Sequence, residues 1–238
     1  MIILGVECSA VSVSVAVLKD NQIICEDFQN NGYTHSVTLL PMIKSVLDSC
    51  GLSVSSVDVF SVSAGPGSFT GLRIGAATVK GLASLGSLCL GVSTLEAMAF
   101  DHRDFEGVVC PCMDARCSQV YNALFEVKSG EIERKCEDRA VMLPELISEI
   151  KEIDNSVLLV GDGASLTYNK ISGECPELLE KVILADEERR FQHAAGVCFL
   201  AQKLLDSGTK AVPADELMLN YLRLPQAERE LKKKENVK

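Results

Sequence analysis

The order of predicted elements repeats once along the chain, and this repetition restricts the folds that the sequence can adopt. Alternating apolar residues predict three successive strands in the N-terminal part, with a polar turn between the second and the third. The same pattern returns after residue 106, and in both copies the first strand ends near an acidic residue, Glu7 or Asp114. The predicted strands cover residues 2–8, 11–18 and 22–28, and then 108–113, 119–126 and 131–136. Two similar units joined head to tail are therefore expected.

Helices and further strands follow these three strands in each copy. In the first copy, apolar periodicity and cap signals predict helices over 36–50, 70–85 and 93–100, separated by strands over 57–64 and 88–92. In the second copy, the same signals predict a helix over 143–151, a strand over 156–160 and a helix over 192–205. Three strands followed by alternating helices and strands is the order of an RNase H-like α/β unit.

The fold class is therefore predicted to be α/β, as a duplicated RNase H-like fold of the actin-like (ASKHA) type. Each of the two lobes should contain a mixed sheet flanked by helices. The charged stretch 101–106 marks the best boundary, which divides the chain into domains 1–101 and 102–238. Whether the last helix packs on its own lobe or on the first one is left open by the sequence.

Charge and composition exclude several classes of protein. No apolar run approaches the roughly 20 residues that a membrane span needs, so a cytoplasmic protein is expected. The formal net charge of -10 disfavours broad contact with nucleic acid, because phosphate binding needs an excess of Lys and Arg. Residues 221–238 are the exception, with six basic and three acidic side chains, and are either a solvated helix end or a contact for RNA or a partner. The ten cysteines are dispersed and indicate packing rather than disulfides.

A glycine-rich segment joins the strand over 57–64 to the next helix. It has the glycines of a phosphate-binding loop but lacks the Lys-Ser or Lys-Thr pair that completes a Walker motif. The turn after the first strand contains no glycine, which hinders close approach of the backbone to a triphosphate. The segment is either a structural turn or the remnant of an anion site. The predicted remnant of a nucleotide or anion site consists of Glu7, Ser9, Gly65, Gly67, Ser68 and Asp114.

The helix over 70–85 carries two glycines four residues apart, Gly71 and Gly75, and is apolar on several sides. Small residues at this spacing allow another helix to approach closely, either inside the chain or on another chain. The helix over 36–50 has a similar excess of apolar residues, so we expect a partner interface on both helices, which the change Gly75→Arg should abolish without unfolding the monomer. The predicted interface consists of Leu39, Leu40, Ile43, Val46, Leu72, Ile74, Gly75, Thr78, Val79 and Leu82.

Residues that could carry catalysis are scarce. The three histidines, His35, His102 and His193, lie far apart in the sequence and form no paired-histidine metal motif. No serine lies in a nucleophile elbow, and no cysteine has an evident base partner. The sequence therefore predicts no catalytic residue, no metal site and no cofactor.

These motifs together resemble those of the TsaB (YeaZ) family over nearly the whole chain. The long glycine and arginine motif is the specific one, and the others agree in order and spacing. The matching segments are ILGVECS at 3–9, HS at 35–36 with LLP at 39–41, GPGSFTGLRIG at 65–75, GVSTLEA at 91–97, DAR at 114–116 and YLR at 221–223.

The resemblance implies a non-catalytic subunit with a decayed nucleotide site. Proteins of this family pair with the catalytic homologue TsaD through two helices of the N-terminal lobe, and the ATPase TsaE joins them in a ternary complex. That complex transfers a threonylcarbamoyl group to the adenosine beside the anticodon of tRNAs that read ANN codons. The resemblance thus implies contact with tRNA through the complex, a homodimer when the chain is alone, and no membrane partner.

Two departures from the family and its partner weaken any residual nucleotide or metal site. The family usually has Asp-Thr-Ser where this chain has Glu7-Cys8-Ser9, and Leu39 stands where the partner's second metal-binding histidine would be. Three alternatives remain open: an independent actin-like ATPase or kinase, a peptidase, and direct tRNA binding through the basic tail.

Overall fold

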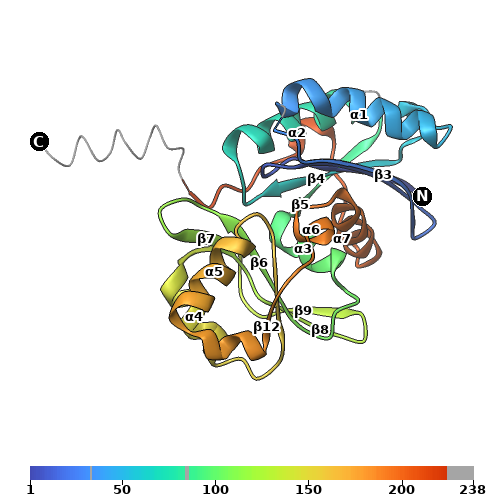
Figure 1. Cartoon of the computed structure of the whole chain (residues 1–238). Helices are drawn as coiled ribbons and strands as arrows, with labels where there is room; N and C mark the ends of the chain where they lie inside the picture. The colour runs from blue at the N-terminus through green and yellow to red at the C-terminus, as the bar shows by residue number, and fades with distance from the viewer. Residues whose placement is uncertain (33, 84–85, 224–238) are drawn as a thin grey trace, which may run out of the picture.

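The computed structural model describes residues 1–32, 34–83 and 86–223, in which two mixed sheets are flanked by helices (Figure 1). The first sheet has the strand order β3-β2-β1-β4-β5, with β1 to β3 antiparallel and with β4 and β5 parallel to β1. Its strands are β1 (Ile2–Glu7), β2 (Val13–Lys19), β3 (Gln22–Gln29), β4 (Val59–Gly65) and β5 (Leu88–Ser93). The predicted order of three strands followed by alternating helices and strands is confirmed for this lobe.

Helices cover both faces of the first sheet. Strand β1 has the side-chain period of two, so Leu4 and Val6 enter the core beneath α1 and α2, whereas Ile3 enters the core beneath α3 and α7. The four helices are α1 (His35–Ser49), α2 (Phe69–Ala83), α3 (Thr94–Asp101) and α7 (Ala194–Asp206), and a 3₁₀ turn, η1 (Val54–Ser56), follows α1.

The second sheet repeats this plan. Its strand order is β10-β7-β6-β11-β12, and β8 pairs with both β6 and β9. Its strands are β6 (Gly107–Asp114), β7 (Gln119–Asn122), β8 (Phe125–Lys128), β9 (Glu131–Arg134), β10 (Arg139–Met142), β11 (Val157–Val160) and β12 (Val182–Leu184). Its helices are α4 (Leu143–Lys151), α5 (Ala164–Glu174) and the short α6 (Glu187–Arg190), with a 3₁₀ turn η2 (Pro176–Glu180). A later 3₁₀ turn, η3 (Ala214–Glu216), packs on α2 of the first lobe.

Helix α3 lies between the two sheets and contributes to both cores. Ala97 packs with the core beneath α7, whereas Leu95 and Met98 pack with Val109 and Phe125 of the second sheet. Helices α4 and α5 cover the opposite face of that sheet. The two lobes therefore share one buried helix, and the structure between them is continuous.

The chain returns to the first lobe after the second sheet. Helix α7 belongs by chain order to the predicted domain 102–238, but it packs on β1 and β2 of the first sheet. Gly5 makes room for this helix, since a Cβ atom there would lie 2.6 Å from Sγ of Cys198. Residue Val212 then bridges to Cys89 at the edge of the first sheet. Residues 194–223 thus join the first lobe, because the face of its sheet beneath α3 and α7 is apolar and α3 alone leaves β1 and β2 for α7 to cover.

Most predicted elements are present, with small differences in the second lobe. The predicted strand over 119–126 is two strands, β7 and β8, which pair with different neighbours. Strand β10, strand β12 and helix α5 were not predicted, because the two strands are short and α5 has little apolar periodicity. In the described residues no helix has the length and apolar character that a membrane crossing requires.

Candidate functional site

Helices α1 and α2 lie next to each other on the outer side of the first sheet (Figure 1). Their inward side chains are buried in the core of the chain itself, including those of Leu39 and Leu72. Five residues of the predicted interface are buried in this way and do not reach the surface on which a partner would bind. This corrects the predicted positions of Leu39, Val46, Leu72, Gly75 and Val79. Ile43 is also buried, but it lines an apolar groove between the two helices.

The two glycines of α2 serve the packing of this helix on its own sheet. A Cβ atom at Gly75 would lie 2.7 Å from Sγ of Cys8 and 3.2 Å from Cγ2 of Val62, and one at Gly71 would overlap the carbonyl of Cys8. The close approach therefore lies inside the chain, which was one of the two alternatives left open by the sequence. An arginine at position 75 would disrupt the core, so the expectation that Gly75→Arg leaves the monomer folded is wrong.

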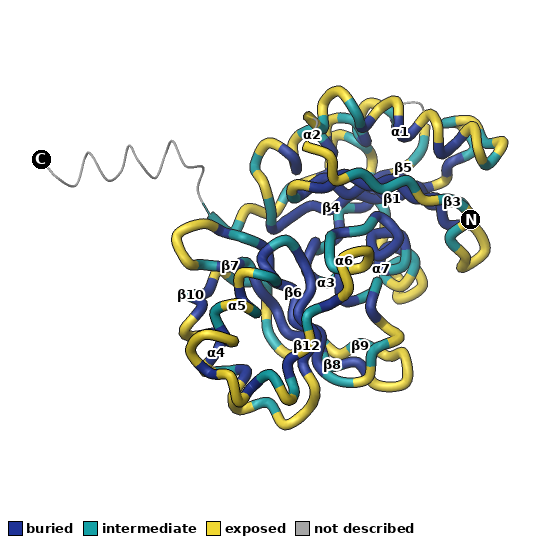
Figure 2. Tube along the Cα trace, in the orientation of Figure 1, coloured by how far each residue is buried: buried dark blue, intermediate teal, exposed yellow. Residues whose placement is uncertain are grey.

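The outward side of the helix pair is exposed and partly apolar (Figure 2). Leu40 and Val37 are 54% and 68% exposed, and Leu82 is half-buried at the wall of an apolar groove of about 400 Å³ between α1, η1 and α2. Ile74 and Thr78 lie on the same flank of α2 as Leu82, eight and four residues earlier in the helix, respectively. We call this surface the helix-pair face and define it by Val37, Leu40, Pro41, Ile74, Ala77, Thr78 and Leu82.

A second feature is a cleft of about 310 Å³ between the lobes. Four of the six residues predicted for an anion site line it, namely Ser9, Gly67, Ser68 and Asp114. The tight loop before α2 is held to the first turn by the amide of Ser68, which donates to the carbonyl of Ser9 at 2.6 Å. The structure thus brings the predicted loops of both lobes together, and the anion-binding role of the cleft stays a prediction.

The side chain of Glu7 is directed into the first lobe and does not line the cleft. It is 1% exposed, and its Oε1 accepts a hydrogen bond from the amide of Ser9 at 2.6 Å while its Oε2 accepts one from the hydroxyl of Ser63. Burial raises the pKa of Glu7, and the hydrogen bonds from Ser63 and Ser9 oppose this effect. Glu7 therefore connects β1 to β4 and offers no free oxygen to a metal or nucleotide.

The acidic residues of the second lobe do face the cleft. Asp114 Oδ1 accepts a hydrogen bond from the amide of Arg116 at 2.7 Å, and its side chain is 30% exposed. Asp162 also lines the cleft and accepts a hydrogen bond from Gln192 at 2.9 Å. Burial raises the pKa of Asp162, and the nearby charge of Asp114 acts in the same direction. In the part of the chain that the structure describes, these residues belong to no group of three side chains able to hold a metal ion.

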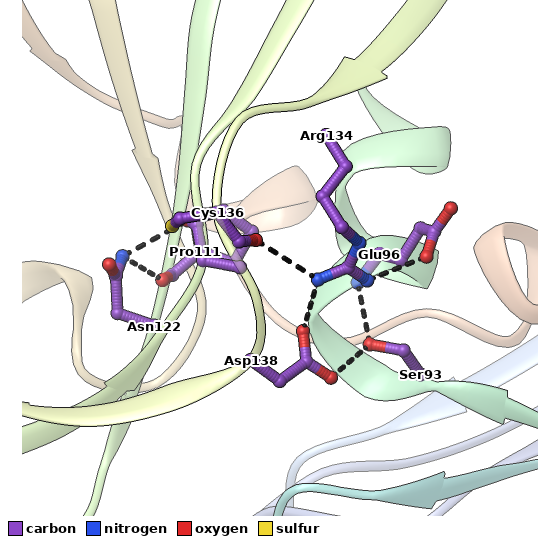
Figure 3. A network of polar contacts seen from close by, with 8 residues as sticks. Ser93, Glu96, Pro111, Asn122, Arg134, Cys136 and Asp138 are labelled. Carbon is purple, nitrogen blue, oxygen red and sulfur yellow. Dashed lines mark hydrogen bonds and ion pairs between the residues drawn. The ribbon is translucent and has the colours of Figure 1, made fainter.

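A network of charged side chains between the lobes was not predicted (Figure 3). Arg134 of β9 donates to Glu96 of α3 and to Asp138, both at 2.6 Å, and Asp138 also accepts from the hydroxyl of Ser93 at 2.6 Å. Burial opposes the charge of Arg134, but its hydrogen bonds to Glu96 and Asp138 outweigh burial and raise its pKa. The hydroxyl of Ser93 also caps α3 by accepting from the amide of Glu96. The Ser-x-x-Glu spacing at 93–96 was the only sequence signal for this network.

Comparisons with known proteins agree on one family. A family model described as TsaD, tRNA N6-adenosine threonylcarbamoyltransferase, matches residues 15–230. A Bacillus subtilis protein, tRNA threonylcarbamoyladenosine biosynthesis protein TsaB, is 32% identical over 229 residues, which are 96% of this chain and 96% of that protein. Its Escherichia coli counterpart of the same name is 32% identical over 167 residues, with 68% of this chain and 72% of that protein covered.

Solved structures lead to the same assignment. A Pseudomonas aeruginosa structure described as an uncharacterised protein with similarity to the peptidase YEAZ has a TM-score of 0.77 and 25% identity, and covers 93% of this chain and 99% of its own. The structure of YeaZ from the same species has a TM-score of 0.73 and 26% identity, and it covers 93% of this chain and 99% of the YeaZ chain. The predicted fold class, α/β of the duplicated actin-like type, is confirmed. Alignment over almost the full length of both proteins shows that the chain belongs to the TsaB family.

Proposed function

We propose that this chain is a non-catalytic docking subunit that binds the transferase TsaD through its helix-pair face. The chain belongs to the machinery of threonylcarbamoyladenosine biosynthesis in tRNA, as its family membership establishes. Within that machinery it would hold and activate the transferase, and it would meet TsaE and tRNA through the assembly.

The observation that carries the proposal is the exposed apolar surface on α1 and α2. Val37, Leu40 and Pro41 are exposed on the outer side of α1, beside the groove that Leu82 lines. Exposed apolar patches bordered by polar residues mark protein interfaces, and Lys44 and Asp48 border this one. Burial of such a face stabilises a complex by about 25 cal/mol per Å² of apolar area before the cost of association.

The likeness of this chain to the transferase family supports the choice of partner. The transferase model matches residues 15–230, so a protein of that family should carry helices equivalent to α1 and α2. Two related folds can pair through equivalent surfaces around an approximate twofold axis, as identical subunits do. The same pairing would give a homodimer when the chain is alone.

The geometry of the first turn supports a role without catalysis. In a nucleotide-dependent relative, the carboxylate after the first strand would have to face the cleft. Here the carboxylate of Glu7 binds Ser9 and Ser63 inside its own lobe. The proposal therefore assigns the chemistry of the pathway to the partner.

The test replaces small or apolar residues on the helix-pair face. Ala77→Arg and Leu40→Arg place a charge on exposed positions, so the chain should fold normally, which circular dichroism checks. We expect each change to weaken binding to the purified transferase by about a hundredfold in isothermal titration calorimetry, because a charge would be buried without a partner. Ser148→Arg, an exposed position on α4 of the other lobe, is the matched control and should bind as the wild type does.

Two results would contradict the proposal. Binding of both arginine variants with wild-type affinity would exclude the helix-pair face. Turnover of ATP by the purified chain alone, at a rate that Asp114→Asn abolishes, would instead favour the rival proposal of an independent actin-like ATPase.

A further inference from the structure

We propose that residues 217–223 form a strap that holds the two lobes together across the inter-lobe cleft. A segment of the chain itself, rather than a bound ligand, would then set how far the lobes are apart. This segment lies where the described chain ends, between α2 and β7 (Figure 1). Three contacts carry the inference, two on the first lobe and one on the second.

The first contact is with the ends of β4 and β5. Leu217 is buried in the core beneath α1 and α2, and the amide of Asn220 donates to the carbonyl of Ala64 at 2.7 Å. A Cβ atom at Gly91 would lie 3.2 Å from Cδ1 of Leu217, and one at Gly65 would overlap the carbonyl of Asn220. Gly65, whose φ is +126°, was predicted to serve an anion site, but the space above it is taken by the strap.

The second contact is with the first turn of α2. The ring of Tyr221 lies 4.5 Å from the ring of Phe69, measured between centroids, and its hydroxyl accepts a hydrogen bond from Nε of Arg73 at 3.3 Å. The guanidinium of Arg73 also stacks on Phe69, with its Cζ atom 3.8 Å from the centroid of the ring. The tilted pair of rings and the cation over Phe69 add to the stability of the strap at this point.

The third contact crosses to the second lobe. Nη1 of Arg223 donates to the carbonyl of Ala115 at 2.6 Å, in the turn that follows Asp114. Residues 116–118 of this turn all have positive φ, between 56° and 67°, so the turn is tightly wound. A hydrogen bond from a charged donor that is partly buried is stronger than one between neutral groups. Arg223 is therefore the link by which the strap holds the second lobe.

The strap also forms part of the cleft. Residues 220–223 line it together with Ser9, Gly67 and Asp114. A segment anchored to both lobes and lining the cleft between them restrains the opening of that cleft. Loss of the bond between Arg223 and Ala115 should therefore let the cleft open wider about α3, which both lobes share, while each lobe keeps its own core.

Hydrogen exchange of the isolated full-length protein, followed by mass spectrometry, tests the strap. In Arg223→Ala we expect amides of residues 115–119 and 220–222 to exchange at least tenfold faster, while β1 and β6 keep wild-type rates. Small-angle scattering should show a larger radius of gyration. The matched control is Arg116→Ala in the same turn, because the guanidinium of Arg116 is 83% exposed and pairs with its neighbour Asp114 at 3.4 Å. The control should leave residues 220–222 at wild-type rates.

A second variant tests the other end of the strap. Tyr221→Ala removes the contacts with Phe69 and Arg73, which both belong to the first lobe. Because the strap joins the two lobes, this change should also speed exchange at residues 115–119 of the second lobe. Wild-type exchange at 115–119 in both variants would overturn the strap. Faster exchange in Arg116→Ala equal to that in Arg223→Ala would also overturn it. The measurement uses the chain alone, so its outcome does not depend on binding to the transferase.

Discussion

The turns after the first strands of the two lobes share one hydrogen bond and differ in their surroundings. In both, a carboxylate accepts a bond from the amide two residues later: Glu7 from Ser9 at 2.6 Å, and Asp114 from Arg116 at 2.7 Å. Glu7 is almost fully buried and also binds Ser63, whereas the side chain of Asp114 is 30% exposed and faces the cleft.

The difference shows how a repeated local motif acquires separate roles. Strand β1 runs beside β4 in register from Ile3 with Val59 to Val6 with Val62, so a glutamate at position 7 is next to Ser63. The shorter side chain of Asp114 stays within its own turn and pairs weakly with Arg116. The first carboxylate therefore contributes to stability, and the second remains available at the cleft.

Removal of the buried carboxylate should have the largest effect. Glu7→Ala leaves the amide of Ser9 and the hydroxyl of Ser63 without their acceptor in a buried place, so we expect a loss of about 3 kcal/mol in the free energy of unfolding. Urea denaturation followed by circular dichroism measures it. A loss below about 1 kcal/mol would mean that the two turns are equivalent after all.

Removal of one donor to that carboxylate should cost less. Ser63→Ala deletes a hydroxyl that donates to Glu7 but leaves the bond from Ser9 in place, so we expect a loss of about 1.5 kcal/mol by the same denaturation. The pKa of Glu7 should rise further, because the bond from Ser63 opposes the effect of burial. Carboxyl titration by NMR checks this direction, and a fall in the pKa would contradict it.

The pH dependence of stability should report the burial of Glu7. Because its folded-state pKa is raised, the folded protein holds this proton more tightly than the unfolded chain does. The contribution of Glu7 is thus fully present below the ordinary glutamate pKa and is lost as pH rises through the folded-state value. Relative to Glu7→Gln, the wild type should lose stability over this window. A wild type that gains stability relative to the variant as pH rises would reverse the sign.

The corresponding change in the second lobe should have the smallest effect. Asp114→Asn keeps an oxygen that can accept from the amide of Arg116, and the ion pair that it removes is largely exposed, so we expect a change within about 0.5 kcal/mol. The same urea denaturation measures it. A loss as large as that of Glu7→Ala would remove the contrast between the lobes.

The sequence was informative where a pattern is local. Strand alternation and helix caps predicted the elements of the first lobe to within a few residues, because a half-buried strand or helix carries its period in its own side chains. It was less informative on α2, where apolar residues occur on several sides. Val79 and Leu82 are both apolar, yet only the packing of α2 on β1 and β4 decides that Val79 is buried and Leu82 reaches the groove.

Contacts between distant segments were decided by the tertiary structure alone. The sequence by itself determined the duplicated α/β fold and the family, and it predicted four of the residues that the tertiary structure brings to one cleft, Ser9, Gly67, Ser68 and Asp114. No local period or spacing predicts the return of α7 to the first sheet or the strap ending at Arg223. The Ser-x-x-Glu spacing at 93–96 indicates the cap of α3 but not the pairing of Glu96 with Arg134. Each of these contacts depends on which surfaces meet once the two sheets have formed. Arg134 and Glu96 are 38 residues apart and Arg223 and Ala115 are 108 residues apart, so no local sequence pattern can predict that they bind each other.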